Sequence, residues 1–453
     1  MSSGPLKAAG LPGLPEEGRI VVGFSGGADS TALAHWLMGE VNKERILLAH
    51  VNHMLRGGEA DRDQLAAEGF AREHGLGIEV LRADVGRLAE ERGMGTEECG
   101  REIRYAFFHK LASSRNDRIL TAHNADDNAE TILLNLCRGA GLDGLCGIPP
   151  RRGKILRPLL YVSRREIEQY CHENGLSYVT DSSNLSDDYT RNRLRHQVLP
   201  VLKELNPRFV HTAGQAARFL SEDRSCLNRQ AESLLERSLN MWGLEAETLL
   251  AEEKSVRSRA VKLFIERRGG SRLEQKHIEE ALHILERGGG ADLPGVRVSC
   301  AQGVFWAGRP AGNIPFEIPA KLGKNPLPGG KSVILREKTC LEAEIPEKIQ
   351  NLLFKNALDY DIMTGLAGEL PEGAVFRSRR PGDRFSPIGR GVSKPIKQIF
   401  QELRVPGPMR DGVPLLVCGG EIAWCPGAGA AERFRATERT KRVLIVEIED
   451  GKG

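Results

Sequence analysis

Short apolar runs and longer amphipathic stretches alternate along the first half of the chain. Four runs of strand length occupy residues 20–24, 46–51, 78–81 and 118–122. Between and after these runs, apolar residues recur at helical spacing from Thr31 onward and over residues 60–74, 96–113 and 125–138. Strands that alternate with helices are typical of a parallel sheet with helices on both faces. The pattern therefore predicts an α/β fold with an N-terminal doubly wound parallel sheet.

The second half of the chain has a different pattern. Helical periodicity dominates residues 207–288, strand-like runs follow at 296–300 and 303–308, and residues 314–331 are rich in Pro, Gly and Lys. A chain of 453 residues exceeds what one hydrophobic core usually organises. The predicted parts are a tail (1–18), a catalytic domain (19–206), a mainly helical middle domain (207–312), a linker and connecting segment (313–371) and a small β-rich or α+β C-terminal domain (372–453).

Composition excludes some classes of protein. The chain is 40% hydrophobic and 28% charged, as in ordinary globular proteins, and no segment reaches the ~18 consecutive apolar residues of a membrane helix. Residues 1–18 lack the apolar run of a signal peptide, and the nine cysteines include no CxxC pair. We therefore expect a cytoplasmic protein with reduced thiols and no membrane contact. The net charge is only +3, so any contact with nucleic acid must come from local basic clusters.

A glycine-rich loop between the first strand and the first helix carries the strongest chemical signal. Its residues are Ser25, Gly26, Gly27, Ala28, Asp29 and Ser30. Glycine allows backbone N–H groups to approach a phosphate, and a helix N-terminus favours negative charge. No lysine follows the glycines, so the loop differs from the GxxxxGK[ST] loop of kinases and GTPases. The simpler interpretation is a turn in which Asp29 or Ser30 caps the helix.

Two further motifs add polar side chains after the second and third predicted strands. Residues 50–56 read His-Val-Asn-His-Met-Leu-Arg. Glu97, Arg101, Arg104 and Tyr105 share one face of a predicted helix. Ligands of open α/β sheets bind at the carboxyl ends of the strands, where these motifs are expected. A solvated ion pair between Glu97 and Arg101 is the alternative without a function.

The motif after the fourth strand, residues 121–131, is the richest in ionisable groups. It contains His123, and it places Asp127 and Glu130 on one helical face. Two neighbouring carboxylates can hold a metal cation or a lysine ammonium, because both ligands are positively charged. Helix capping by Asp126 or Asp127, and a structural role for the histidine, are the alternatives.

The SGGxDS sequence resembles the signature of the PP-loop, or N-type, ATP pyrophosphatases, and the resemblance extends over roughly the first 200 residues. Members of this family cleave ATP between the α and β phosphates. The resemblance implies a Mg²⁺ ion held by Asp29 and Asp127. The implied ATP-binding residues are Ser25, Gly26, Gly27, Ala28, Asp29, Ser30, His50 and His123.

Further segments are similar to the tRNA(Ile)-lysidine synthetase family. They read Arg-Gly-Ala-Gly at 138–141, Gly-Ile-Pro-Pro at 147–150, Arg-Pro-Leu at 157–159, Asp-Ser-Ser-Asn at 181–184 and Arg-Asn-Arg-Leu-Arg at 191–195. The resemblance implies a carbon–nitrogen ligase that adenylates the wobble cytidine of a CAU-anticodon tRNA(Ile) with ATP. Free L-lysine then displaces AMP. The implied catalytic residues are Asp29, Asp127, Glu130 and Arg101, with Asp127 and Glu130 also binding lysine.

Two basic clusters suit contacts with tRNA phosphates. The first comprises Arg191, Arg193 and Arg195. The second lies between Phe376 and Arg410, where nine Lys or Arg and two acidic residues give a net charge of +7. This region resembles the C-terminal tRNA-binding domain of longer family members, and the middle domain is assigned to tRNA binding from its position alone. The predicted tRNA-binding residues of the second cluster are Arg379, Arg380, Arg384, Lys394, Lys397 and Arg410.

Other functions stay open at this point. tRNA 2-thiolation also begins with PP-loop adenylation but needs a sulfur carrier. The lack of CxxC pairs argues against an iron–sulfur type, although Cys99, Cys137 and Cys146 keep it open. A non-catalytic, ATP-responsive tRNA-binding protein would not need the acidic site residues, and amidotransferase-type relatives that act on small metabolites do not explain the +7 cluster. A homodimer is an option that the sequence does not test.

Overall fold

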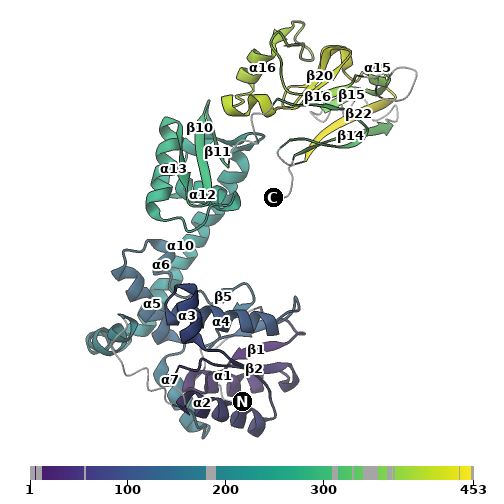
Figure 1. Cartoon of the computed structure of the whole chain (residues 1–453). Helices are drawn as coiled ribbons and strands as arrows, with labels where there is room; N and C mark the ends of the chain where they lie inside the picture. Colours follow the sequence, from purple (N-terminus) through teal and green to yellow (C-terminus); the bar gives the residue numbers. More distant parts are fainter. Residues whose placement is uncertain are drawn as a thin grey trace. The chain divides into compact units, whose positions relative to one another are not determined.

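The computed structural model describes residues 6, 13–55, 58–179, 190–308, 315–328, 331–339, 356–364, 370, 373–437 and 439–449. They belong to two compact units, Met1–Ser225 and Cys226–Gly453. The boundary falls inside helix α10 (Phe209–Ser238), whereas the sequence suggested a boundary after residue 206. No helix in the described ranges is long and apolar enough to cross a membrane. Figure 1 shows the elements of each unit.

The N-terminal unit is built on a six-stranded sheet. Its strands, in spatial order, are β3 (Gly77–Arg82), β2 (Ile46–Asn52), β1 (Ile20–Gly23), β4 (Arg118–Leu120), β6 (Ile155–Leu156) and β5 (Arg151–Arg152). Neighbouring strands are parallel except for β5 and β6, which are antiparallel. The predicted doubly wound parallel sheet is confirmed.

Helices cover both faces of this sheet, because the side chains of a strand point alternately to its two faces. Ile20 and Val22 of β1 pack in one core with α1, α2 and α7, whereas Val21 packs in another with Phe108 of α4. Figure 1 shows the two sets of helices on either side of the strands. The helices of the unit are α1 (Ala28–Glu40), α2 (Gly58–His74), α3 (Val85–Arg92), α4 (Thr96–Leu111), α5 (Ala125–Cys137), α6 (Leu142–Leu145), α7 (Arg164–Glu173), α8 (Thr190–Arg193), a π-helical turn (Leu194–Val198) and α9 (Leu199–Leu205).

The strand order reverses beside β1. The chain moves outward from β1 to β2 and β3, and β4 then pairs with the other edge of β1. Ligands of open α/β sheets bind at such a switch point, outside the carboxyl ends of the strands. The loops after β1 and β4, residues 24–27 and 121–124, therefore meet where a ligand is expected.

Residues 226–308 form a helical module with its own antiparallel sheet. Their core contains Leu234, Val261, Leu285 and Phe305. The predicted helical character is accompanied by five short strands, of which the sequence had indicated the fourth and fifth. The elements are α11 (Ala246–Leu250), α12 (Lys254–Arg267), α13 (Gln275–Arg287), β7 (Leu239–Asn240), β8 (Gly243–Glu245), β9 (Gly289–Leu293), β10 (Val296–Ala301) and β11 (Val304–Ala307).

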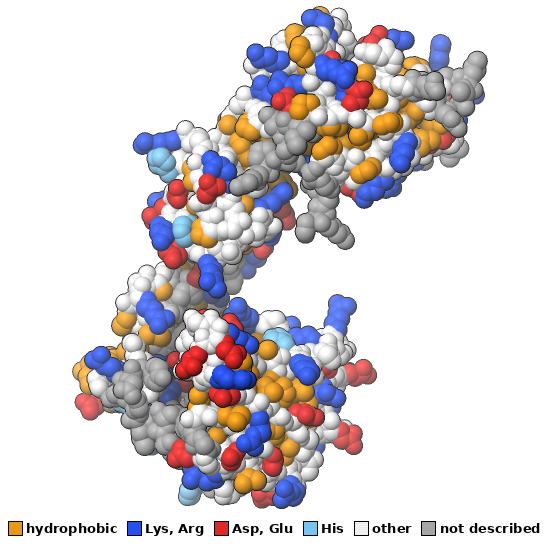
Figure 2. Space-filling view, in the orientation of Figure 1, with side chains coloured by type: hydrophobic (Ala, Val, Ile, Leu, Met, Phe, Trp, Pro, Cys, Tyr) orange, Lys and Arg blue, Asp and Glu red, His pale blue; other side chains and the backbone are white. Residues whose placement is uncertain are grey.

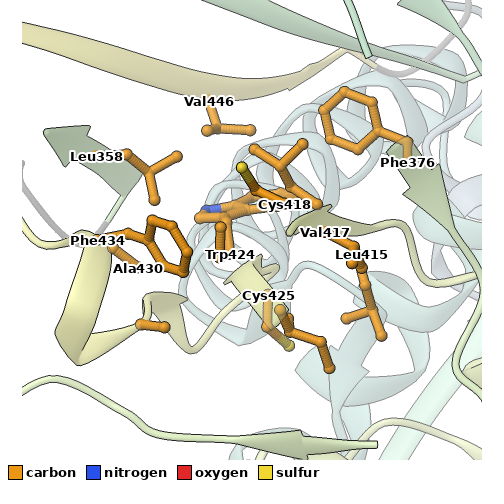
Figure 3. Packing of buried hydrophobic residues seen from close by; sticks show 14 of the residues in the cluster. Leu358, Phe376, Leu415, Val417, Cys418, Trp424, Cys425, Ala430, Phe434 and Val446 are labelled. Carbon is orange, nitrogen blue, oxygen red and sulfur yellow. The ribbon is translucent and has the colours of Figure 1, made fainter. Parts of the chain in front are cut away.

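The C-terminal domain is built around two larger antiparallel sheets. Figure 3 shows the indole of Trp424 inside its core, with Leu358, Phe434 and Val446 around it. The indole N–H donates to Oδ1 of Asn356 at 3.0 Å, so its polar atom is also satisfied. One sheet contains β12 (Glu317–Pro319), β16 (Val375–Arg377), β19 (Leu415–Cys418), β20 (Glu421–Cys425) and β21 (Gly429–Ala430); the other contains β13 (Gly323–Pro326), β14 (Ser332–Thr339), β22 (Arg442–Glu449) and β15 (Ala357–Asp359). The remaining elements are α15 (Tyr360–Thr364), β17 (Arg384–Phe385), β18 (Lys394–Pro395) and α16 (Ile396–Glu402).

The described part of the segment predicted as a linker, 313–371, belongs to this domain instead. β12 pairs with β16, and β14 pairs along its whole length with β22, from Ser332 opposite Glu449 to Thr339 opposite Arg442. Short strands separated by Pro- and Gly-containing turns have the local composition of a linker. The pairing of β14 involves residues more than a hundred positions away, which local composition does not reveal.

Candidate active site

The glycine-rich loop after β1 directs backbone N–H groups toward one point. The amides of Ser25 and Gly26 both donate to Oγ of Ser30 at 3.2 Å, and that hydroxyl donates to the carbonyl of Gly27 at 3.0 Å. Gly26 has φ +84°, a conformation that favours glycine. The loop ends at the N-terminus of α1, where the helix dipole also favours negative charge. This arrangement suits a phosphate group.

Asp29, in the first turn of α1, is held by groups from two other elements. Its Oδ1 accepts from Nδ2 of Asn124 at 3.1 Å, and its Oδ2 accepts from Nη1 of Arg164 at 2.6 Å. Burial raises the pKa of Asp29 to about 6, and the nearby charge of Asp127 adds to the increase, whereas Arg164 and Asn124 oppose it. The ionised carboxylate is therefore destabilised in this site and would gain from a further cation.

Asn124 connects the two carboxylates on which the predicted metal site depends. It is the N-cap of α5. Its side-chain Oδ1 accepts from the backbone N–H of Asp127 at 2.9 Å, and its backbone N–H donates to Oδ2 of Asp127 at 3.1 Å. The same side chain donates to Asp29. Sequence reasoning did not select Asn124, although an Asn three residues before an acidic residue at a helix start is a recognisable capping signal.

Glu130 is buried with two arginines as partners. Its side chain is 1% exposed, and its oxygens accept from Nε of Arg191 at 2.9 Å and from Nε of Arg195 at 2.6 Å. Arg195 also approaches Oδ1 of Asp127 at 3.3 Å. Burial acts to lower the pKa of Arg195, but the hydrogen bond to Glu130 outweighs this effect, so the pKa is raised. Both arginines had been predicted to bind tRNA phosphates, but here they point inward to carboxylates; the neighbouring Arg193 is exposed.

The two histidines lie at the carboxyl ends of β2 and β4. His50 is hydrogen-bonded through Nδ1 to the carbonyl of Phe24 at 3.0 Å, so it supports the start of the loop; burial lowers its pKa. Nδ1 of His123 lies 3.0 Å from Oγ1 of Thr121. Burial, with four nearby arginines including Arg101, lowers the pKa of His123 to about 3. His123 is therefore neutral at physiological pH, among cationic side chains that suit an anionic ligand.

Three charged residues without a predicted role complete the site. Asp126 accepts from Nζ of Lys203 at 2.6 Å and from the backbone amide of Arg164 at 2.8 Å. These contacts join α5 to α9 and α7.

The motif residue Arg56 and the motif at 181–184 lie outside the described residues.

Gly147 is the residue of the 147–150 motif whose identity the structure explains. It has φ +65°, and a Cβ there would lie 2.2 Å from Oδ1 of Asn128, which accepts from the amide of Ile148 at 2.7 Å. We expect Gly147→Ala to lower the free energy of unfolding by about 2–5 kcal/mol, from overpacking and backbone strain together. Urea unfolding of the whole chain measures this.

Gly153 provides the matched control, because it has φ +58° but a Cβ at this position would meet no atom within 4 Å. Gly153→Ala should lower the free energy of unfolding only through backbone strain, by about 1–2 kcal/mol. Equal losses in the two variants would show that the contact with Asn128 is unimportant.

The residues present fit a Mg²⁺ ion between Asp29 and Asp127. The described residues contain no group of three or more His, Cys, Asp or Glu side chains able to hold a metal. A Mg²⁺ ion that acts with ATP is commonly bound by one or two carboxylates, with phosphate and water oxygens as its other ligands. Asp29 and Asp127 share Asn124 as a hydrogen-bond partner, and the charge of Asp127 raises the pKa of Asp29. A shared cation would relieve this repulsion.

The basic C-terminal cluster is less available than its charge of +7 suggests. Arg377 forms two hydrogen bonds with Asp383, at 2.7 and 2.8 Å, in the interior. Arg410, predicted to bind tRNA, is 8% exposed and donates to the carbonyl of Val405 at 3.1 Å. Figure 2 shows Lys and Arg side chains interspersed with acidic ones on the visible face of this domain.

The other predicted tRNA-binding side chains of this cluster lie nearer the surface. Arg379 pairs with Asp411 at 2.7 Å, and Lys394 pairs with Glu402 at 2.6 Å. Lys397 is exposed. Arg380 and Arg384 are also exposed, and bond Glu317 and Ser393 respectively.

A doubly wound sheet, an anion-binding loop at its switch point and facing carboxylates together define a nucleotide-binding α/β domain of the PP-loop class. The PP-loop domain family matches residues 7–202, and the family described as TilS substrate C-terminal domain matches residues 375–447. The class inferred from the fold therefore agrees with the sequence comparison.

Curated relatives identify the family over the full chain. A tRNA(Ile)-lysidine synthase from Clostridium tetani is 32% identical, with 96% of this chain and 95% of that protein covered. The synthase from Persephonella marina is also 32% identical, with 96% of each covered, and that from Bacillus subtilis is 32% identical over 90% of this chain and 89% of its own length. The chain belongs to the tRNA(Ile)-lysidine synthase family, which confirms the resemblance found in the sequence.

Proposed function

We propose that this chain catalyses the ATP-dependent formation of lysidine on tRNA(Ile). The observation that carries the proposal is that the glycine-rich loop, Asp29 and Asp127 meet at one end of the sheet, where Asn124 bonds both carboxylates. The curated relatives that match this chain over nearly their whole length are tRNA(Ile)-lysidine synthases. The reaction is an ATP-dependent modification of tRNA. In this proposal free L-lysine is the second substrate, which makes the reaction a carbon–nitrogen ligation.

In the first step, O2 of the wobble cytidine attacks the α-phosphorus of ATP, and the bond to the departing pyrophosphate breaks. In this proposal the loop at 25–30 and the N-terminus of α1 hold the departing pyrophosphate, because a helix N-terminus favours negative charge. Asp29 and Asp127 would hold a Mg²⁺ ion, which when bound neutralises phosphate charge. Arg101 lies close enough to His123 for its charge to lower the pKa of the imidazole, and in this proposal Arg101 and neutral His123 contact the nucleotide.

In the second step, the ε-amine of lysine attacks C2 of the cytidine, and the bond from C2 to the oxygen of AMP breaks. The amine has a pKa of about 10.4 in water and must lose a proton before attack. Asp127 is our candidate for binding the ammonium and accepting its proton, because its side chain is 20% exposed. Glu130 acts indirectly in this proposal, since its oxygens already accept from Arg191 and Arg195. Those two guanidiniums would favour departure of anionic AMP.

The test is incorporation of radiolabelled lysine into unmodified tRNA(Ile) with a CAU anticodon, with and without ATP. A methionine tRNA with the same anticodon is the control. ATP-dependent labelling of the isoleucine tRNA alone supports lysidine synthesis. Pyrophosphate release without lysine transfer would contradict it and favour thiolation or another adenylating reaction, and binding without pyrophosphate release would indicate a non-catalytic protein.

We propose that the exposed cations of the C-terminal domain bind tRNA phosphates. Lys397→Ala should raise the KM for tRNA with kcat unchanged, and it should reduce the slope of log affinity against log salt by about 1. Arg410→Ala should instead lower the thermal midpoint, because the buried guanidinium supports the carbonyl of Val405. Salt-dependent tRNA binding and thermal unfolding of both variants separate the roles. A reversal of the two effects would refute this assignment.

A further inference from the structure

A pocket of about 260 Å³ lies beside the proposed active site, and the reaction described above gives it no role. One wall is formed by Ala125, Leu160 and Tyr161. The opposite wall belongs to the start of α10, where residues 210, 211, 214, 215 and 218 share one helical face. All of these residues belong to the N-terminal unit.

The lining combines an aromatic ring, apolar surface and a few polar groups. Tyr161 is 40% exposed, which is unusual for a large ring that only serves a core. Burial raises the pKa of its hydroxyl, and the nearby cation of Arg218 opposes that increase. Gln215 adds an amide that can both donate and accept. A nucleobase has the complementary features: a flat apolar face, a hydrogen-bonding edge and an adjoining phosphate.

The position of the pocket limits what can occupy it. Ala125 is the first residue of α5, and Asp126 and Asp127 follow it directly. Ala125, which lines one wall of the pocket, and the proposed catalytic residue Asp127 therefore lie within one turn of α5, so the pocket is next to the site where the cytidine would react. A volume of about 260 Å³ is also below the 300–1,000 Å³ typical of sites for drug-sized ligands, which suits a single ring system.

We propose that this pocket binds one unstacked base of the tRNA, immediately next to the cytidine that is modified. The inference rests on the proposed function, because it takes tRNA as the substrate. Tyr161 stacks on the base, Gln215 contacts its edge and Arg218 contacts its phosphate. The contact holds the anticodon strand open, so that the cytidine can enter the active site.

Gly214 provides a variant that tests the pocket without harming the fold. Glycine is unfavourable inside a helix, yet Gly214 lies within α10, and its missing side chain leaves the pocket open. A Cβ at this position meets no atom within 4 Å. Gly214→Leu should therefore fill the pocket while its thermal midpoint stays at or above that of the unchanged protein. Gly214→Ala is the matched control, since it gives a similar helical gain and fills much less space.

The experiment measures lysine transfer by the full chain to tRNA(Ile) that is intact, or abasic at the position before or after the cytidine. For intact tRNA, Gly214→Leu and Tyr161→Leu should raise the KM about 10- to 100-fold with kcat within about twofold, whereas Tyr161→Phe and Gly214→Ala should have small effects. The KM values for ATP and lysine should not change. With one of the two abasic tRNAs, Gly214→Leu should lose its effect, because the base that it excludes is already missing.

An unchanged KM for intact tRNA in Gly214→Leu overturns the proposal, as does an equal increase with all three tRNAs. A rise in the KM for lysine or ATP assigns the pocket to that substrate and also overturns it. These outcomes require that the unchanged protein forms lysidine. Absence of lysine transfer by the unchanged protein is instead a failure of the proposed function.

Discussion

Asp29→Asn should abolish adenylation while tRNA binding is retained. The substitution keeps the size of the side chain but removes the charge that the Mg²⁺–ATP complex needs, so we expect tRNA-dependent pyrophosphate release to fall by about 10²- to 10³-fold or more. Pyrophosphate release measures the reaction, and filter binding measures the affinity for tRNA. The basic surfaces that we assign to tRNA do not include Asp29, so the dissociation constant should stay within about twofold.

Asp126→Asn is the matched control for this prediction. Asp126 is a neighbouring carboxylate at the same end of the sheet. It accepts from Lys203 and from the backbone amide of Arg164, so it holds α5 to its neighbouring helices. Its loss should reduce the rate only modestly. Similar losses of pyrophosphate release in the two variants would show that Asp29 has no special role.

The raised pKa of Asp29 gives the same prediction a pH dependence. Only the ionised carboxylate binds a cation, and burial raises its pKa to about 6. The rate of adenylation should therefore be at its maximum well above pH 6, and it should decline as the pH falls through that value. A higher Mg²⁺ concentration should move the decline to lower pH, because the ion competes with the proton. In Asp29→Asn any residual rate should lack this transition.

Glu130→Gln should destabilise the fold by about 1.5–3 kcal/mol, the range for loss of hydrogen bonds between charged groups, and also impair lysine transfer. The carboxylate is buried and balances two partly buried guanidiniums, so its neutralisation leaves Asp127 to balance both of them. Urea unfolding measures the loss of stability. Single-turnover transfer of lysine to pre-adenylated tRNA measures the second step, which should slow because Arg191 and Arg195 are no longer held beside Asp127.

The double variant Glu130→Gln with Arg195→Met separates charge balance from simple loss of contacts. Removal of one guanidinium restores the balance, so the double variant should be more stable than the sum of the two single losses predicts. Arg191 then retains Asp127 as an acidic neighbour at 3.7 Å. Strictly additive losses would mean that the charges of Glu130, Arg191 and Arg195 do not balance one another.

Sequence reasoning located most of the N-terminal fold because the information is local. Each buried strand is a short apolar run, each covering helix has its own periodicity, and the order of these elements restricts the sheet to a doubly wound arrangement. The same reasoning failed for residues 313–371, where short strands depend on partners near residues 375 and 445. Their local composition indicates turns, and only pairing across the domain makes them strands.

The sequence by itself determined the type of fold, the position of the anion-binding loop and the presence of acidic residues after the fourth strand. The tertiary structure alone decided which charges meet. Arg191 and Arg195 bind Glu130, 61 and 65 residues away, and Arg164 reaches Asp29 across 135 residues. It also decided that Arg377 and Arg410 are buried. A charged side chain has much the same local pattern on a surface as in an ion pair, so its partner is set by which elements fold together.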